Sequence, residues 1–406
     1  MEISLDRLKE DIESLARIGQ DPRGGITRPS FSQADLEARA WLKTKIQEAG
    51  LCCRQDGAGN IFGRLGSEGR VVLVGSHIDT VINGGKFDGS AGVLAGLECL
   101  RIIKENGISL GKPIELVAFT DEEGNLVGDF LGSRAFASLL NKDEIEKGMT
   151  SFGRPLRDIL AGTEFTTQSI LRAHEERPEV EAFLELHIEQ GASLEMDDVP
   201  IGIVERIAGK RYFWCSFVGK ADHGGTTPLE LRHDAFLATA DFALKGTQLV
   251  ATRYYGSMVT VGKVSVHPGS FSVVPGQVDF SLDFRSSSPD TLKALEAELL
   301  TLAREISSTR GLSFYSRLVD QTEPAALSER LIGIMKEECA RLDYPSMTLT
   351  SGAGHDAQIV SSLAEAGMIF IPCLDGISHS PAEMINWEDL EKGANLLLHT
   401  LLRLAS

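Results

Sequence analysis

Two short apolar runs constrain the fold of this chain more than any other feature. Residues 71–74 and 114–119 have the length and apolar content of buried strands, and a helical pattern follows each of them, near 91–106 and over 133–140. Strands that alternate with helices are typical of a mostly parallel sheet whose faces are covered by helices. The sequence therefore predicts an α/β fold.

The order of predicted strands and helices changes between residues 211 and 324. There the pattern predicts a strand, a helix, two strands, a helix and a last strand, in the order βαββαβ. This order is typical of an antiparallel sheet with helices on one face. A chain of 406 residues also exceeds the size at which one hydrophobic core keeps growing. We therefore predict an α/β domain made of residues 1–210 and 325–406, with an α+β domain, residues 211–324, inserted between the two parts.

The overall charge of the chain excludes several classes of partner. The sequence contains 40 Lys and Arg against 58 Asp and Glu, a formal net charge of −18, which disfavours nucleic acid and anionic membrane surfaces. No apolar run approaches the roughly 20 residues that span a bilayer, and no apolar signal segment opens the chain. The six cysteines show no C-x-x-C spacing. We expect a cytoplasmic protein with no nucleic-acid or membrane partner.

Five short blocks of the sequence supply residue types that bind metal ions, each at the edge of a predicted strand. Their histidines and carboxylates are His77, Asp88, Glu122, Glu123, His187 and His379. Three imidazoles and two carboxylates suit a pair of Zn²⁺-like ions, which leaves one carboxylate as a general base. Taken alone, each block has an ordinary structural explanation, such as a solvated turn or a core histidine. Together they predict a metal site where strands end.

Two of these blocks suggest more specific roles. Asp79 lies two residues after His77, so strand alternation places both side chains on one face, and we expect the Asp79 carboxylate to hold the second ring nitrogen of His77. Glu122 and Glu123 are adjacent, and one of them would bind a metal ion while the other accepts a proton from the attacking water. Other catalytic schemes fit poorly, because the chain has no G-x-S-x-G elbow, no G-x-G-x-x-G after a strand and no Walker-type loop.

The five blocks, in this order, resemble those of the M20 family of metal-dependent amidohydrolases and peptidases. The closer likeness is to the branch that contains N-carbamoyl-L-amino acid hydrolases, allantoate amidohydrolases and β-ureidopropionases, and it covers essentially the whole chain. Further runs that carry it are residues 24–28, 221–228, 351–357 and 376–383.

The resemblance implies a fold, an activity and a set of partners. It implies a lid and dimerisation role for residues 211–324, a homodimer, and two divalent ions per subunit, which would be Zn, Mn, Co or Ni. The implied reaction is hydrolysis of the ureido C–N bond of an N-carbamoyl-L-amino acid, a small ureide that bears a carboxylate, with release of the amino acid, CO₂ and ammonia. Allantoate is the alternative substrate, and another ureide or an N-acyl amino acid fits less well. A metal-binding protein without activity is a different alternative, against which the intact Glu122 argues.

The resemblance also implies the metal ligands. His77, Asp88 and His187 would hold one ion, and Asp88, Glu123 and His379 would hold the other, so that Asp88 bridges the two. Glu122 corresponds to the general base, and Asp79 belongs to the catalytic group beside it.

Four further residues stand at catalytic or substrate-binding positions of the branch. His223 corresponds to a lid-domain histidine that stabilises the developing oxyanion, usually from the partner subunit. Arg285 corresponds to the arginine that binds the substrate carboxylate, and Gln190 to a polar residue beside the site. Ser272 stands where the branch usually has a substrate-contacting Asn. Because a hydroxyl is shorter than an amide and offers fewer donors, Ser272 leaves the exact substrate open.

Overall fold

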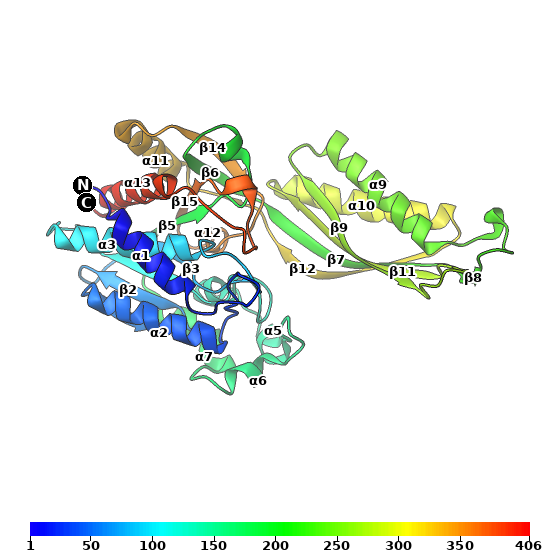
Figure 1. Cartoon of the computed structure of the whole chain (residues 1–406), viewed down its shortest axis with the longest axis horizontal. Coiled ribbons are helices and arrows are strands. Elements are labelled where there is room, and N and C mark those ends of the chain that lie inside the picture. Colours follow the sequence, from blue (N-terminus) through cyan, green and yellow to red (C-terminus); the bar gives the residue numbers. More distant parts are fainter. The chain divides into compact units, whose positions relative to one another are not determined.

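The chain folds into two compact units. A computed structural model describes all 406 residues and divides them into a first unit, Met1–Glu205 with Ala326–Ser406, and a second unit, Arg206–Ala325 (Figure 1). The second unit interrupts the sequence of the first, and its ends lie within a few residues of those predicted. None of the helices combines the length and the apolar content that crossing a membrane requires.

The first unit is built on a nine-stranded sheet with the order β1-β2-β4-β3-β5-β15-β6-β13, and β14 pairs with β6. Its central neighbours, β4-β3-β5-β15, are parallel, and antiparallel pairs flank them on both sides. Every residue of β3 and β4 is buried, as expected for strands covered on both faces. The predicted mostly parallel sheet is therefore confirmed. Its strands are β1 (Cys52–Gln55), β2 (Ile61–Leu65), β3 (Val71–His77), β4 (Ile114–Phe119), β5 (Val180–Ile188), β6 (Ile201–Ile207), β13 (Ala325–Ala326), β14 (Ser346–Ser351) and β15 (Glu365–Ile371).

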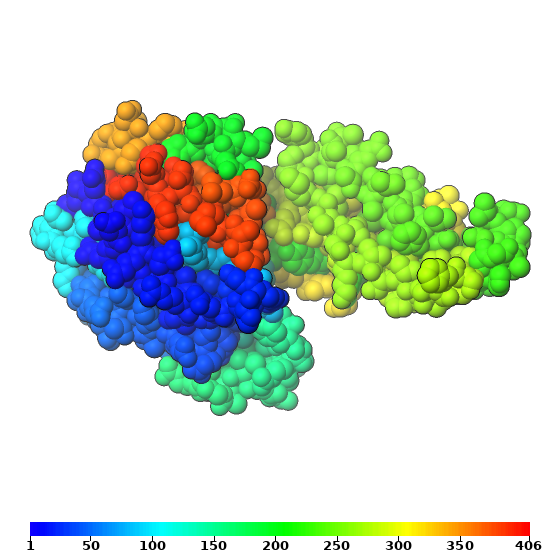
Figure 2. Space-filling model, viewed as in Figure 1, coloured from blue at the N-terminus to red at the C-terminus, as the bar shows by residue number.

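The helices of the first unit pack against this sheet and against one another. Helix α3 contacts β3, β4 and β5 and lies beside α1 and α13, so it is buried on nearly all sides. Its mostly apolar composition is typical of a helix buried in this way. The two ends of the chain meet there: the Ile3 N–H donates to the Asn395 side chain at 2.9 Å, and the blue and red segments adjoin in Figure 2. The helices are α1 (Leu5–Ala16), α2 (Gln33–Glu48), α3 (Ser90–Glu105), α4 (Leu131–Phe136), α5 (Lys142–Lys147), α6 (Leu156–Leu160), α7 (Thr167–Arg172), α8 (Ser193–Met196), α11 (Glu329–Leu342), α12 (Asp356–Val360) and α13 (Trp387–Ala405).

The second unit has the predicted βαββαβ order. Its four-stranded antiparallel sheet has the order β12-β7-β11-β9, and a separate two-stranded pair joins β8 to β10. Buried and half-buried residues alternate along β11, because α9 and α10 pack on one face of the sheet. Phe217, Phe242 and Phe280 form the centre of the core on that face. The elements are β7 (Gly209–Val218), β8 (Asp222–His223), α9 (Ala235–Arg253), β9 (Met258–His267), β10 (Val273–Val274), β11 (Gln277–Ser286), α10 (Pro289–Thr309) and β12 (Ser313–Thr322).

Candidate metal centre

The predicted metal ligands lie where the central parallel strands end. His77 is the last residue of β3, His187 is the residue before the end of β5, and Glu123 follows β4. Asp88 lies in the loop that leads into α3, and His379 lies in the loop that follows β15. Because β4, β3, β5 and β15 are neighbours in the sheet, their carboxyl ends bring these five side chains to one edge.

The five side chains form two groups that share Asp88. The ligand atoms of His77, Asp88 and His187 all lie within 4.8 Å of one another, and so do those of Asp88, Glu123 and His379. One Asp88 oxygen lies 3.1 Å from His187 Nε2, and the other lies 3.1 Å from His379 Nε2. His379 Nε2 is also 3.5 Å from Glu123 Oε2. Asp88 is thus placed to contact an ion in each group.

The His77 ring presents an unprotonated nitrogen to this centre. His77 Nδ1 donates to the backbone carbonyl of Asp79 at 3.1 Å, and His187 Nδ1 donates to the carbonyl of Ile188 at 2.9 Å. In the neutral His77 ring, Nε2 is therefore a lone pair, and this atom is buried without a hydrogen-bond partner. Burial lowers the pKa of His77 to about 4, which keeps the ring neutral. The His77 ring therefore has the form that binds a metal ion.

The carboxylates of the centre carry more negative charge than the protein balances. Burial, with the neighbouring carboxylates, raises the pKa of Glu122 and of Glu123 well above the usual range. Burial by itself would lower the pKa of His187. The hydrogen bond and the charge of Asp88 outweigh burial and raise the pKa of His187 to about 9. Buried carboxylates are retained where a cation compensates them. Together with the orphaned His77 Nε2, this charge fits a pair of divalent cations.

Asp79 differs from expectation in the way that it supports the site. We expected its carboxylate to hold the His77 ring, but Oδ1 lies 3.6 Å from His77 Nδ1, and the Asp79 backbone carbonyl is the atom within hydrogen-bond distance. The two carboxylate oxygens accept instead from the backbone N–H groups of Glu122 and Glu123, each at 3.3 Å. The physical reason is that the ends of β3 and β4 are adjacent, so Asp79 faces the orphaned N–H groups after β4. Asp79 therefore orients the pair of glutamates as well as the histidine.

Gln190 and the backbone around it complete the centre. Gln190 Nε2 lies 3.0 and 3.2 Å from the two oxygens of Asp88, so the structure places this residue beside the shared ligand. Gln190 and His379 both have φ of 55°, and Asp121 has φ of 57°, in the left-handed region that non-glycine residues rarely adopt. Such strained residues cluster at functional sites.

Three buried residues beside the centre had no predicted role. Glu185 accepts from the Ser76 hydroxyl at 2.7 Å and from the Ala357 N–H at 2.8 Å. The His355 ring stacks edge-on against His187, with 4.6 Å between centroids, and Asp356 follows it at the start of α12. His355 and Asp356 belong to the run 351–357, which carried part of the family resemblance. The contacts of all three residues, however, join segments that are far apart in the sequence. Spacing could not have revealed those contacts.

The remaining predicted residues belong to the second unit, where two of them lie together and one lies apart. β8 pairs with β10, and the Gly224 N–H donates to the Ser272 carbonyl at 2.7 Å, so His223 and Ser272 are neighbours. Arg285 pairs with Lys210 at the opposite end of β7 from His223. The guanidinium of Arg285 contacts the Asp283 carboxylate at 3.0 Å.

The orientation of the exposed His223 ring fixes its tautomer. The N–H groups of Gly225 and Thr226 donate to His223 Nδ1 at 3.0 and 3.1 Å. Because Nδ1 accepts both bonds, a neutral ring carries its proton on Nε2. His223 therefore presents an N–H donor to its surroundings.

Known proteins match the chain along nearly its whole length. Residues 73–403 match the model of peptidase family M20/M25/M40. The chain belongs to this family. An N-carbamoyl-L-amino acid amidohydrolase of Geobacillus stearothermophilus is 36% identical and an allantoate amidohydrolase of Escherichia coli is 34% identical, and each alignment covers 98% of this chain and at least 97% of the relative. The crystal structure of a hydantoinase/carbamoylase family amidase from Burkholderia multivorans matches with a TM-score of 0.91 and 32% identity, covering 100% of this chain and 98% of that one.

Membership of the M20 family confirms the predicted family and hydrolase class. The family is metal-dependent, and this M20 chain has three candidate ligand groups: the two that share Asp88, and a third made of Glu185, His187 and His355. Its relatives are amidohydrolases, so the chain is a hydrolase that acts on amide or ureide bonds.

Proposed function

We propose that this chain hydrolyses the ureido C–N bond of an N-carbamoyl-L-amino acid and releases the L-amino acid, CO₂ and ammonia. The observation that carries the proposal is the pair of ligand groups that share Asp88, with the carboxylate of Glu122 beside them and outside both. Three relatives that carry the N-carbamoyl-L-amino acid amidohydrolase name, at 33–36% identity, support this substrate class.

The metal groups supply the electrophilic part of the chemistry. His77, Asp88 and His187 would hold one divalent ion and Asp88, Glu123 and His379 the other, and Zn, Mn, Co and Ni all suit histidine and carboxylate ligands. Such ions, when bound, act as Lewis acids that make water a stronger nucleophile and polarise the ureide carbonyl.

Glu122 transfers the proton. Its Oε2 lies 3.7 Å from His77 Nε2, and its side chain is almost fully buried beside the ligands. Cations in the neighbouring groups favour its charged form, which accepts a proton as water adds to the carbonyl carbon. The same proton then passes to the leaving nitrogen as the C–N bond breaks. Asp79 holds Glu122 in place through the backbone N–H of that residue.

Residues of the second unit bind the substrate and its oxyanion. Arg285 binds the substrate carboxylate, and His223 Nε2–H stabilises the oxyanion. These two residues cannot contact one small ureide from the same subunit. Arg285 pairs with Lys210 and Gln277 pairs with Val218, so at about 3.3 Å per residue roughly 26 Å of strand separates them before the chain reaches His223. This separation supports the proposal that His223 and Ser272 act on the site of the partner subunit in a homodimer.

The second unit has a surface that suits this homodimer. β9 is an edge strand of the four-stranded sheet, and α9 packs beside it. Helix α9 exposes Phe236, Leu237 and Leu244, with 46%, 47% and 75% of their surfaces accessible. An open strand edge next to exposed apolar side chains is a surface that pairing with a second copy would cover. The free cysteines suit a reducing cytoplasm.

Allantoate is the second candidate substrate. Two allantoate amidohydrolases, from Escherichia coli and Bacillus subtilis, are 34% and 33% identical to this chain. Ser272, adjacent to His223, is the residue through which the two substrates would be distinguished, because its hydroxyl replaces an amide.

An ammonia-release assay tests the proposal. The panel consists of N-carbamoyl-L-amino acids, allantoate, ureidoglycolate and N-carbamoyl-β-alanine, each offered to chelated protein before and after divalent metal is restored. We expect metal-dependent ammonia release, fastest from an N-carbamoyl-L-amino acid. Faster turnover of allantoate would favour the second candidate, and no release from any compound would contradict both.

A further inference from the structure

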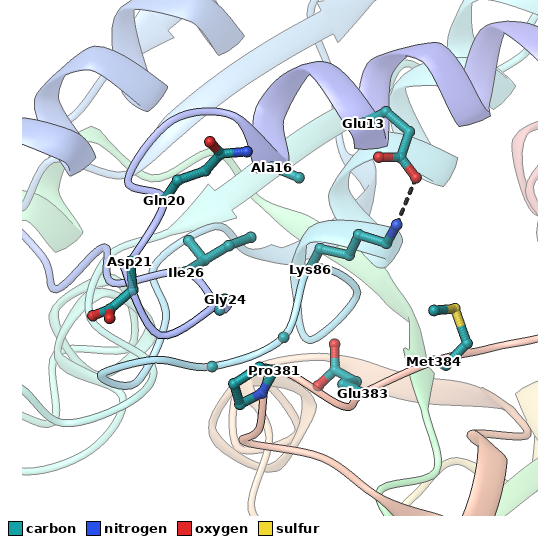
Figure 3. Close-up of a pocket in the computed structure, with 13 residues that line it drawn as sticks. Glu13, Ala16, Gln20, Asp21, Gly24, Ile26, Lys86, Pro381, Glu383 and Met384 are labelled. Atoms are coloured by element: carbon teal, nitrogen blue, oxygen red, sulfur yellow. Dashed lines mark hydrogen bonds and ion pairs between the residues drawn. The ribbon is translucent and has the colours of Figure 1, made fainter.

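A cavity of about 430 Å³ lies behind the loop that carries Asp88. The segments that line it come from the end of α1 and the chain after it, from residues 84–86 and from residues 381–384 (Figure 3). Lys86 and Glu13 form an ion pair at 2.6 Å on one side of the cavity, and Glu383 lies on another (Figure 3). Glu383 also reaches the metal centre, so its side chain separates the cavity from Asp88.

Glu383 accepts three hydrogen bonds between the cavity and the metal centre. Its Oε1 accepts from the backbone N–H groups of Phe87 and Asp88 at 2.8 and 3.2 Å. Its Oε2 accepts from the Ser378 hydroxyl at 3.0 Å, and the Ser378 oxygen lies 3.2 Å from Asp88 Oδ2. One carboxylate thus contacts the backbone of one ligand and the residue before another, His379.

The position of Glu383 is specific for a carboxylate. Only 2% of its surface is exposed, and no Lys or Arg forms an ion pair with it, so the three hydrogen bonds are what compensates its burial. The backbone of Gly85 packs against it so closely that a Cβ there would lie 2.0 Å from the carboxylate carbon. The backbone of Gly85 therefore packs directly against this carboxylate on one side, and the cavity lies on another.

We propose that Glu383 is a positioning residue that joins the loop of Asp88 to the loop of His379 and thereby sets the distance between the two ligand groups. The two loops are 290 residues apart between Ser378 and Asp88, so noncovalent contacts alone hold their spacing. Asp88 must contact both groups, and His379 is half exposed in a left-handed backbone conformation, so the His379 group depends most on this support. The inference rests on the proposed metal site and is independent of which ureide is the substrate.

Metal affinity in substituted proteins tests this role. Glu383→Ala should weaken binding of the second ion by about 10–100-fold, the effect typical of residues that orient metal ligands. Glu383→Gln keeps a carbonyl that accepts from Phe87 and Asp88, so its loss should be smaller. Glu13→Gln is the matched control, because Glu13 lines the same cavity and contacts only Lys86 there. Dissociation constants are measured by chelator competition, and the unfolding temperature verifies that each variant folds.

Acetate provides a rescue that a merely structural role would not produce. The atoms that Glu383→Ala removes are those of acetate, and the vacated space opens onto the cavity, so acetate can enter and accept the same hydrogen bonds. We expect acetate to restore the second ion to Glu383→Ala, and sodium chloride of equal ionic strength to have no effect. The wild type and Glu13→Gln should not respond to acetate.

Several results would overturn the inference. These are wild-type metal affinity in Glu383→Ala, or a loss in a folded Glu383→Ala protein that acetate does not reverse. If Glu383→Ala does not fold, Glu383→Gln and Ser378→Ala decide, and unchanged affinity for two ions in both contradicts the role. A wild type that binds fewer than two ions contradicts the proposed metal site as well. Failure of the substrate panel alone leaves these affinity results intact, so the two failures are distinguishable.

Discussion

Arg285 and His223 lie at opposite ends of one antiparallel strand pair: Arg285 faces Lys210 near the start of β7, and His223 follows the end of β7 (Figure 1). This separation supports the proposal that one substrate receives the two residues from two subunits.

Two inactive variants should therefore complement each other. Glu122→Gln removes the base and His223→Ala removes the oxyanion donor, and each homodimer should be nearly inactive. After subunit exchange, a mixed dimer has one site with an intact Glu122 and an intact His223 from the partner. We expect activity to return when the two proteins are mixed. No recovery, with heterodimers shown by mass spectrometry, would mean that His223 acts in its own subunit or not at all.

Glu122→Gln and Glu123→Gln should differ although the residues are adjacent. Glu122 lies outside both ligand groups, so its substitution should keep two ions and the fold but lower kcat by about 10²–10⁴-fold, the usual contribution of a general base. Glu123 belongs to the His379 group, so its substitution should lose metal. Metal analysis and kcat of both variants decide the assignment. Full activity in metal-loaded Glu122→Gln protein would remove Glu122 from the role of base.

Asp88→Ala should lose more metal than any single histidine substitution. It removes a ligand from both groups that share it, whereas His77→Ala or His379→Ala removes one ligand from one group. The ions would also lose the negative charge between them. Metal analysis of the purified variants measures the difference. Near-stoichiometric binding of two ions without Asp88 would exclude a bridging role.

Arg285→Lys should raise KM sharply and leave metal binding unchanged. Asp283 and the Tyr212 hydroxyl hold the guanidinium at 3.0 Å each, so the planar group is oriented before the substrate arrives. Lys keeps the charge but lacks the planar fork that binds a carboxylate through two hydrogen bonds. Arg317→Lys, on the exposed strand β12, is the matched control. Equal KM values for wild type and Arg285→Lys would place Arg285 outside the substrate site.

Much of the fold follows from patterns that are local in the sequence. The runs that became β3 and β4 are fully buried and apolar, and the strict alternation along β11 reports a sheet covered on one face. Strands β1 and β2 were not predicted, because both are short, and β1 lies at the edge of the sheet with no buried residue. Whether such short segments form strands depends more on pairing with neighbouring strands than on the intrinsic strand propensity of their residues.

The site could be predicted in its residue types but not in all its contacts. Metal-binding residue types at strand ends pointed to candidate ligands, and the structure brings these side chains together. The orientation of Asp79 depends on N–H groups after a neighbouring strand, and Glu383 meets Asp88 across 295 positions of sequence. Spacing along the chain carries no information about contacts of that kind, so only the folded structure assigns them.

Titration of divalent metal into chelated protein tests whether hydrolysis depends on two ions at the groups that share Asp88. Bound ions and ammonia release from an N-carbamoyl-L-amino acid are measured together at each addition. Because Asp88 belongs to both ligand groups, we predict that the protein takes up two ions per subunit and that ammonia release appears as they bind. Undiminished ammonia release by metal-free protein, or binding of no more than one ion at full activity, would contradict the account.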